Sequence, residues 1–221
     1  KDNNFTWKDF QQRNNSELVA VLGNFVNRSL TLTEKYFGGV VPEAMNLTDG
    51  DKEALSQILT IKQDVENSLE QYRFREALNN AMGLGRLGNK YITEQEPWKV
   101  WKTDQERVKT ILYVNLQITA AIAAVLEPFI PASMAKLRGF LNVDSFDWET
   151  VGNVELLKPG HQLNKSSLLF EPITDEVVQA QIDKLNATKI ANQKANFKAP
   201  EQKPTISFDD FSKCDIRTAT I

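Results

Sequence analysis

The sequence predicts an all-α protein, built over residues 1–142 as an antiparallel bundle of about five helices. Apolar residues recur there with the i, i+3, i+4 spacing of amphipathic helices. Pairs of Thr and Asp three residues apart, the signature of a helix N-terminus, precede two of these stretches. The apolar–polar alternation that indicates strands is almost absent before residue 142.

The first two helices are predicted from their ends. Thr6 is a plausible N-cap, and the periodic pattern that follows runs to about Tyr36, where two glycines end it. Thr48 and Asp51 repeat the capping signature and open the second helix.

A third helix is predicted from near Phe74 to Ile92. It contains three glycines, each of which lowers helix propensity by roughly 1 kcal/mol. They are tolerable if another helix packs closely against that face: Gly83, Gly85 and Gly88.

The fourth helix is predicted from near Asp104 to Leu126 and the fifth from Pro131 to Leu141. The fourth is apolar nearly all round, so we expect it to be the central, most buried element. Its apolar run continues to Pro131 but is interrupted, and it is shorter than the roughly 20 residues that a membrane span needs. We therefore expect a core helix and no membrane partner.

The chain changes character after residue 142. Residues 143–195 are interpreted as an irregular return segment followed by a C-terminal helix that starts at Asp175, and 196–205 as a Lys-, Gln- and Pro-containing linker. In 206–221, Ile206 and Phe208 alternate, as do Ile216, Thr218 and Thr220, which predicts the truncated first strand of a β domain. Both ends look cut, so we expect a fragment of a longer protein.

Composition excludes several kinds of site. The formal charge is −3, from 26 Lys and Arg against 29 Asp and Glu, so a nucleic acid would have to be held by a local site. His161 and Cys214 are the only residues of their types, too few for a Cys/His zinc site. The lone cysteine excludes an internal disulfide, which fits a reducing, cytoplasmic location. We expect His161 to be structural or merely exposed.

Three stretches, "NSELVAVLGNFVNRSL", "NKYITEQEPWKVWK" and "LEPFIPASMAKLRGFLN", together resemble the C-terminal half of bacterial methionyl-tRNA synthetases. In that family a catalytic domain is followed by a helical anticodon-binding domain. The tail "TISFDDFSKCDIRTATI" is similar to the start of an appended tRNA-binding domain with an oligonucleotide-binding (OB) fold. The resemblance covers nearly the whole chain, and is weakest over residues 143–200.

The resemblance implies an anticodon site made of four residues. Trp98 would stack on a base of the methionine anticodon CAU, and Pro97 would shape the same surface. Asn24 and Arg28 would contact the anticodon bases, above all the first. The motif here has Glu96 before the proline, a carboxylate that would repel phosphate unless it is paired.

The chemistry of these residues suits such a site. Asn24 and Arg28 lie four residues apart, so on a helix they share a face. A stacked base gains roughly 1–3 kcal/mol whatever its identity. Specificity must therefore come from the hydrogen-bonding pair: arginine can donate to cytosine O2 and N3, and asparagine can both donate and accept.

The resemblance also implies partners and cofactors. The partners are the anticodon loop of tRNA(Met), the catalytic domain of the same chain, and a second copy bound through the C-terminal domain. The whole enzyme would join methionine to its tRNA using ATP, and its catalytic domain would bind ATP and could hold zinc. The HIGH- and KMSKS-type sequences that serve ATP are absent here, so we expect no cofactor and no aminoacylation activity in this fragment.

Other interpretations stay open at this point. Without the motif context, a tryptophan after a proline is usually a packing residue, and Asn24 and Arg28 would form a solvated helix edge. The alternatives are a helical scaffold that binds no RNA, and the anticodon-binding domain of another class I synthetase. The remaining tryptophans are interpreted as packing residues: Trp7, Trp101 and Trp148.

Overall fold

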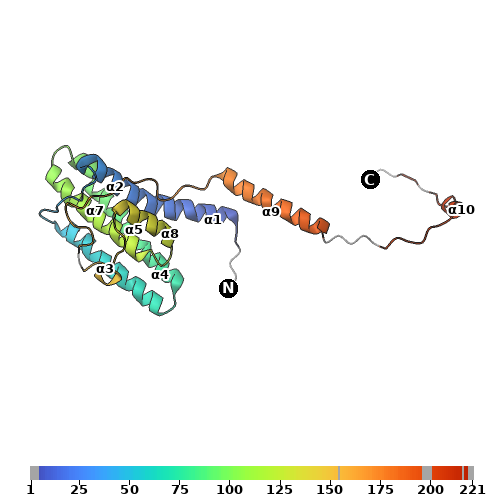
Figure 1. Cartoon of the computed structure of the whole chain (residues 1–221), viewed down its shortest axis with the longest axis horizontal. Helices are drawn as coiled ribbons and strands as arrows, with labels where there is room; N and C mark the ends of the chain where they lie inside the picture. Colours follow the sequence, from blue (N-terminus) through green and yellow to red (C-terminus); the bar gives the residue numbers. More distant parts are fainter. Residues whose placement is uncertain (1–4, 154, 196–200, 216, 219–221) are drawn as a thin grey trace. The chain divides into compact units, whose positions relative to one another are not determined.

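The computed structural model describes residues 5–153, 155–195, 201–215 and 217–218 (Figure 1). The chain divides into two compact units, the first ending at Val178 and the second beginning at Gln179. The first unit is a bundle of helices, in agreement with the fold class that the sequence predicts.

A single long rod opens the bundle. It consists of α1 (Trp7–Arg13), a π-helical stretch η1 (Asn14–Gly23) and α2 (Asn24–Phe37). The Thr6 hydroxyl accepts a hydrogen bond from the Asp9 N–H at 3.1 Å, which confirms the predicted cap. Gly38, at φ 60°, ends the rod in the left-handed conformation that glycine adopts without strain. The rod agrees with the predicted first helix, but the sequence did not indicate its π-helical part.

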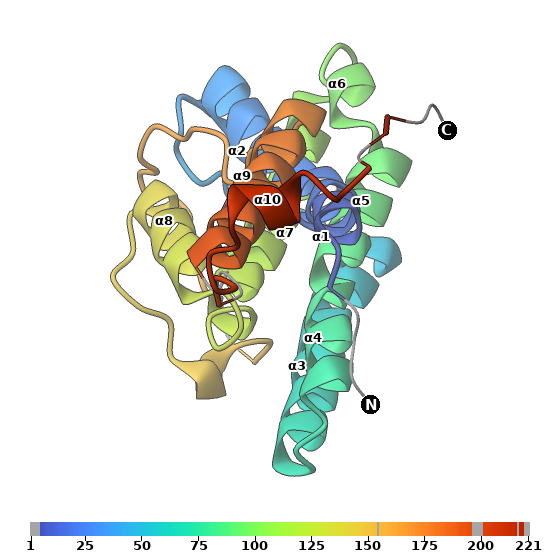
Figure 2. The same ribbon diagram turned by 90° about the vertical axis from the view of Figure 1, so that its right-hand side faces the viewer.

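The second predicted helix is α3 (Asp49–Glu70), and it carries the complete capping box of Thr48 and Asp51. The third is divided at Met82 into α4 (Phe74–Ala81) and α5 (Gly83–Gln95). The α3 and α4 helices lie side by side and project from one end of the bundle (Figure 2).

Two glycines of α5 allow close packing against the rod. A Cβ atom on Gly88 would lie 2.4 Å from the Phe25 ring, and one on Gly85 would lie 2.6 Å from Leu22 Cδ2. Any side chain at these positions would force the helices apart. This confirms the expectation that a helix lies against the glycine face.

The centre of the bundle is α7 (Gln105–Val125), followed by α8 (Pro131–Leu141). By length and composition α7 could cross a membrane, but 94% of its most apolar window is buried inside the bundle. It is the core helix that the sequence predicts. Between α5 and α7 lies the short α6 (Pro97–Val100).

The segment after α8 returns over the bundle without long helices. Its regular elements are a 3₁₀ turn, η2 (Trp148–Thr150), and a single antiparallel bridge between Val40 and Gln162. His161 Nε2 lies 2.7 Å from the Leu141 carbonyl oxygen, which is a structural role. Four side chains anchor the segment in the core: Val151, Leu157, Leu163 and Leu169.

The second unit contains most of α9 (Asp175–Ala195) and the single turn α10 (Phe208–Phe211). No strand is present in residues 201–215 and 217–218, while Ile216 and Thr220 lie outside the described residues. Phe208, expected in a strand, instead begins a helical turn. The reason is local: the Ser207 hydroxyl accepts from the Asp210 N–H and caps it, whereas a lone strand would leave its backbone groups unpaired.

Candidate nucleic-acid interface

The predicted site lies where the turn between α5 and α6 meets α2. Glu96 ends α5 and precedes α6 with φ 42° and ψ 55°, a left-handed conformation that is uncommon for a residue with a side chain, above all before proline. The sharp turn directs the chain back toward α2. Pro97 is buried as the first residue of α6, directly before Trp98, so it offers little exposed surface of its own.

The structure brings Trp98 and Arg28 together although 70 residues separate them. The guanidinium carbon of Arg28 lies 4.8 Å from the centroid of the Trp98 ring, a cation–π contact. Trp98 packs against the core but is only partly buried. Partial burial lowers the pKa of Arg28 from its ordinary value, yet an arginine stays charged at neutral pH. A cation is thus held over a partly buried indole.

Asn24 lies one helical turn before Arg28 on α2, and its side chain is exposed. Among the described residues, neither the Asn24 amide nor the Arg28 guanidinium has a hydrogen-bond or ion-pair partner. The Arg28 side chain is only partly buried, so its guanidinium stays within reach of solvent. These donors are therefore free for a ligand.

The carboxylate next to the site is neutralised. Glu96 Oε1 lies 2.7 Å from Lys99 Nζ, three residues away on the same turn. The pairing meets the condition under which a phosphate could approach, since an isolated carboxylate here would repel it.

A second aromatic group lies at the same end of the bundle. Trp101, at the end of α6, stacks on Tyr36 with ring centroids 4.2 Å apart and an interplanar angle of 11°. Phe37 meets the indole edge-on, with centroids 5.6 Å apart. Packing agrees with the sequence-based interpretation of Trp101, whose partners on α2 no local pattern predicts.

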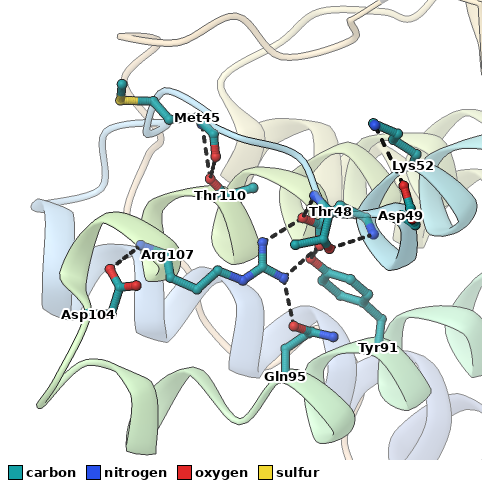
Figure 3. A network of polar contacts seen from close by, with 10 residues as sticks. Met45, Thr48, Asp49, Lys52, Tyr91, Gln95, Asp104, Arg107 and Thr110 are labelled. Carbon is teal, nitrogen blue, oxygen red and sulfur yellow. Dashed lines mark hydrogen bonds and ion pairs between the residues drawn. The ribbon is translucent and has the colours of Figure 1, made fainter.

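A buried ion pair between Asp51 and Arg107 lies beside the end of α5. Figure 3 shows Arg107 between Thr48, Tyr91 and Gln95. The side chain of Asp51 is fully buried and accepts hydrogen bonds from Arg107 Nη2, at 2.8 Å, and from the Tyr91 hydroxyl. The same Nη2 donates to Gln95 Oε1 at 2.7 Å. Because Gln95 is the last residue of α5, the network fixes the helix end from which Glu96 and Pro97 depart.

Two opposing effects set the pKa of Asp51. Burial by itself raises the pKa, but the hydrogen bonds from Arg107, Tyr91 and Thr48 outweigh it and lower the pKa to about 2. Burial, together with the bond to Asp51, raises the pKa of Tyr91. At neutral pH the network therefore holds a carboxylate, a guanidinium and a neutral phenol. The sequence identified Asp51 only as a helix cap, because Arg107 lies far along the chain.

A large open groove is lined in part by the α3–α4 turn, which lies at the other end of the bundle from α6 (Figure 2). Its volume is about 1190 Å³, and its walls come from α1 and η1, the α3–α4 turn with α4, and the segment after α7. Most of its lining surface is apolar, and Tyr72 and Phe74 are 80% and 60% exposed. None of the four predicted site residues lies in it.

Comparisons with known proteins agree with the motif resemblance. A family described as the anticodon binding domain of methionyl tRNA ligase matches residues 41–189, and a family of class I tRNA synthetases (M) matches residues 1–30. The methionine–tRNA ligases of Phocaeicola vulgatus and Bacteroides fragilis (strain YCH46) are each 56% identical to the chain over all 221 residues. The chain spans 32% of the length of each of these relatives.

The fold is similar to that of solved synthetases. The apo form of Mycobacterium tuberculosis methionyl-tRNA synthetase superimposes with a TM-score of 0.72 at 26% identity, covering 79% of this chain and 36% of that one. The same enzyme in complex with methionyl-adenylate superimposes with a TM-score of 0.61 at 25% identity, covering 74% of this chain and 33% of that one.

Proposed function

The chain belongs to the family of anticodon-binding domains of methionyl-tRNA ligases, and on that premise we propose that its α2–α6 surface reads the CAU anticodon of tRNA(Met). One observation carries the proposal. A partly exposed indole, Trp98, lies under the unpaired guanidinium of Arg28, with the free amide of Asn24 one turn away.

The three side chains divide the work of recognition. A base stacks on the Trp98 indole, which supplies affinity without regard to sequence. The arriving base displaces Arg28 from the ring, and the guanidinium then donates to acceptors on the base edge. Asn24 can both donate and accept, so the pair distinguishes cytosine from uracil at the first anticodon position. Pro97 sets the direction of the indole.

The proposal extends to the longer protein that the relatives represent. We propose that it joins methionine to tRNA in the cytoplasm, with a catalytic part outside this chain that binds ATP and can hold zinc. The synthetase match over residues 1–30 supports a connection to that part. Residues 206–221 would start an OB-fold domain through which two copies associate.

Binding of short RNA hairpins tests the proposal. We expect the protein to bind a stem-loop with a CAU anticodon at least several-fold more tightly than the same loop carrying UAU. Equal affinity for the two would favour a helical scaffold without an RNA role. A preference for the anticodon of cysteine, valine, leucine or isoleucine tRNA would favour another class I synthetase.

Two variants separate affinity from specificity. Trp98→Ala should weaken both hairpins by about 5- to 150-fold, the equivalent of one lost stack. Arg28→Ala should instead bring the CAU/UAU ratio close to one. Trp7→Ala is the matched control, because Trp7 packs with Phe5 and Phe10 on and beside α1. A large drop in melting temperature on Trp98→Ala would show that Trp98 serves packing.

A further inference from the structure

The aromatic cluster of Tyr36, Phe37 and Trp101 lies outside the hydrophobic core. All three side chains are partly exposed, and within the described parts of the chain none belongs to the apolar side chains packed on the core. Trp98, three residues before Trp101, does belong to that set. The cluster is therefore held together by ring–ring contacts at the surface, between the end of α2 and the end of α6.

Two lysines flank this cluster. Lys35 Nζ lies 5.4 Å from the centroid of the Tyr36 ring, and Lys102 follows Trp101 directly. Both are exposed, and neither forms an ion pair with any residue that the structure describes. Their charges are thus available to an anion beside the rings.

The cluster lies on the same two helices as Arg28 and Trp98. Trp98 and Trp101 are one turn apart at α6, and Arg28 and Tyr36 are eight residues apart on α2, about 12 Å along the helix axis. The same two helices thus carry two aromatic positions in succession, each with a cation over or beside a ring.

We propose that the stacked pair of Tyr36 and Trp101 is a second platform for an unpaired nucleobase, next to the base held on Trp98. The base adds a third ring to the stack, and Lys35 and Lys102 contact the phosphates beside it. Aromatic rings with adjacent cations are how single-stranded nucleic acid is bound without sequence preference. The inference rests on the proposed function and assigns to the same surface a second nucleotide of the loop.

The test combines protein variants with RNA hairpins in which one loop nucleotide at a time lacks its base. With the intact CAU hairpin, we expect Trp101→Ala to weaken binding at least five-fold. That loss should disappear for the hairpin that lacks the base stacked on Trp101. The loss caused by Trp98→Ala should disappear at a different loop position.

Further variants cover the case in which Trp101→Ala unfolds the protein. Trp101→Phe keeps a flat ring and should retain most of the affinity. Lys102→Gln should remove about one phosphate contact, so the slope of log affinity against log salt should become less steep by the share of that contact. Trp7→Ala again serves as the control for removal of an indole.

The outcomes separate this inference from the proposed function. A loss under two-fold for Trp101→Ala, or an equal loss with every abasic hairpin, would overturn the second platform. If Trp98→Ala retains its effect in that case, the proposed function stands. If CAU and UAU bind equally and Trp98→Ala has no effect, both fail.

Discussion

Asp51 is the residue on which the geometry of the site most depends. Its carboxylate is fully buried and joins α3, α5 and α7 through Arg107, Tyr91 and Gln95. Removal of one partner of a buried ion pair leaves an uncompensated charge, which typically costs 3–5 kcal/mol. The Arg107 guanidinium would be that charge.

Replacement of Asp51 by Asn should destabilise the protein at neutral pH and change how stability depends on pH. The pKa of Asp51 falls from 3.8 to about 2 on folding, so the carboxylate stabilises the fold above pH 4 and this contribution is lost as the pH falls toward 2. We expect the difference in unfolding free energy between wild type and variant to shrink by about 2 kcal/mol over that interval. Urea unfolding at several pH values measures it.

Asp49→Asn is the matched control for this experiment. Asp49 lies on the same turn of α3, but its side chain is fully exposed. It forms an exposed ion pair with Lys52, with Oδ1 3.7 Å from Nζ. Its removal should change stability little at any pH, because exposed ion pairs contribute about 0–1 kcal/mol. A pH profile for Asp51→Asn that matches the Asp49→Asn profile would contradict the role given to the buried pair.

The residues of the proposed site could be predicted from the sequence, but their arrangement in space could not. The motif resemblance supplied Asn24, Arg28 and Trp98, and helical spacing placed the first two on one face. The contact between Arg28 and Trp98 depends on how α6 packs against α2, which no local pattern encodes. The cluster around Trp101 was missed for the same reason.

At the scale of elements, the close approach of α5 to the rod is what the glycines make possible. Gly88→Ala should lower stability by about 1–3 kcal/mol, the usual cost of overpacking, because the new methyl group would meet the Phe25 ring. Chemical denaturation gives the value. Gly139→Ala on α8 is the control: nothing lies within 4 Å of that position, so the better helix former should stabilise by about 0.5–1 kcal/mol. Stabilisation of both variants would contradict the packing argument.

Helix ends were predictable and helix interiors less so. Thr6, Thr48 and Gly38 act through hydrogen bonds or dihedral angles within a few residues, so the sequence reveals them directly. The π-helical stretch η1 and the break at Met82 lie inside strongly periodic segments. Neither η1 nor α5 begins with a side-chain cap, so no capping signal in the sequence marked these features.

At the scale of the whole molecule, net charge and site charge differ in sign. The chain carries −3, while Arg28, Lys35 and Lys102 offer positive groups that pair with no carboxylate in the part of the chain that the structure describes. We expect RNA binding to depend only modestly on salt, with a slope of log affinity against log salt of about −1.4, because Lys35 and Lys102 are the proposed phosphate contacts and each contact to a single strand contributes about −0.7. Titrations between 50 and 200 mM salt measure the slope. A slope steeper than about −5 would require a broad basic surface instead.

The bundle as a whole followed from the sequence, since α7 is apolar all round and its neighbours are amphipathic. The course of residues 143–174 did not, because their burial depends on a few isolated side chains such as Leu157 and Leu163. Beyond Val178 the described chain packs few apolar side chains, and Leu185 and Ile190 on α9 stay more than half exposed.

The groove beside the α3–α4 turn also affects how the purified protein behaves. Tyr72 and Phe74 remain in contact with water there. Covering such apolar surface with another surface removes it from water, which lowers the free energy. Two copies that meet at these ends therefore lower their free energy, and so does any hydrophobic additive that settles between the walls. We therefore expect the chain to self-associate at high concentration and a mild detergent or dilution to reverse this, which light scattering over a concentration series measures.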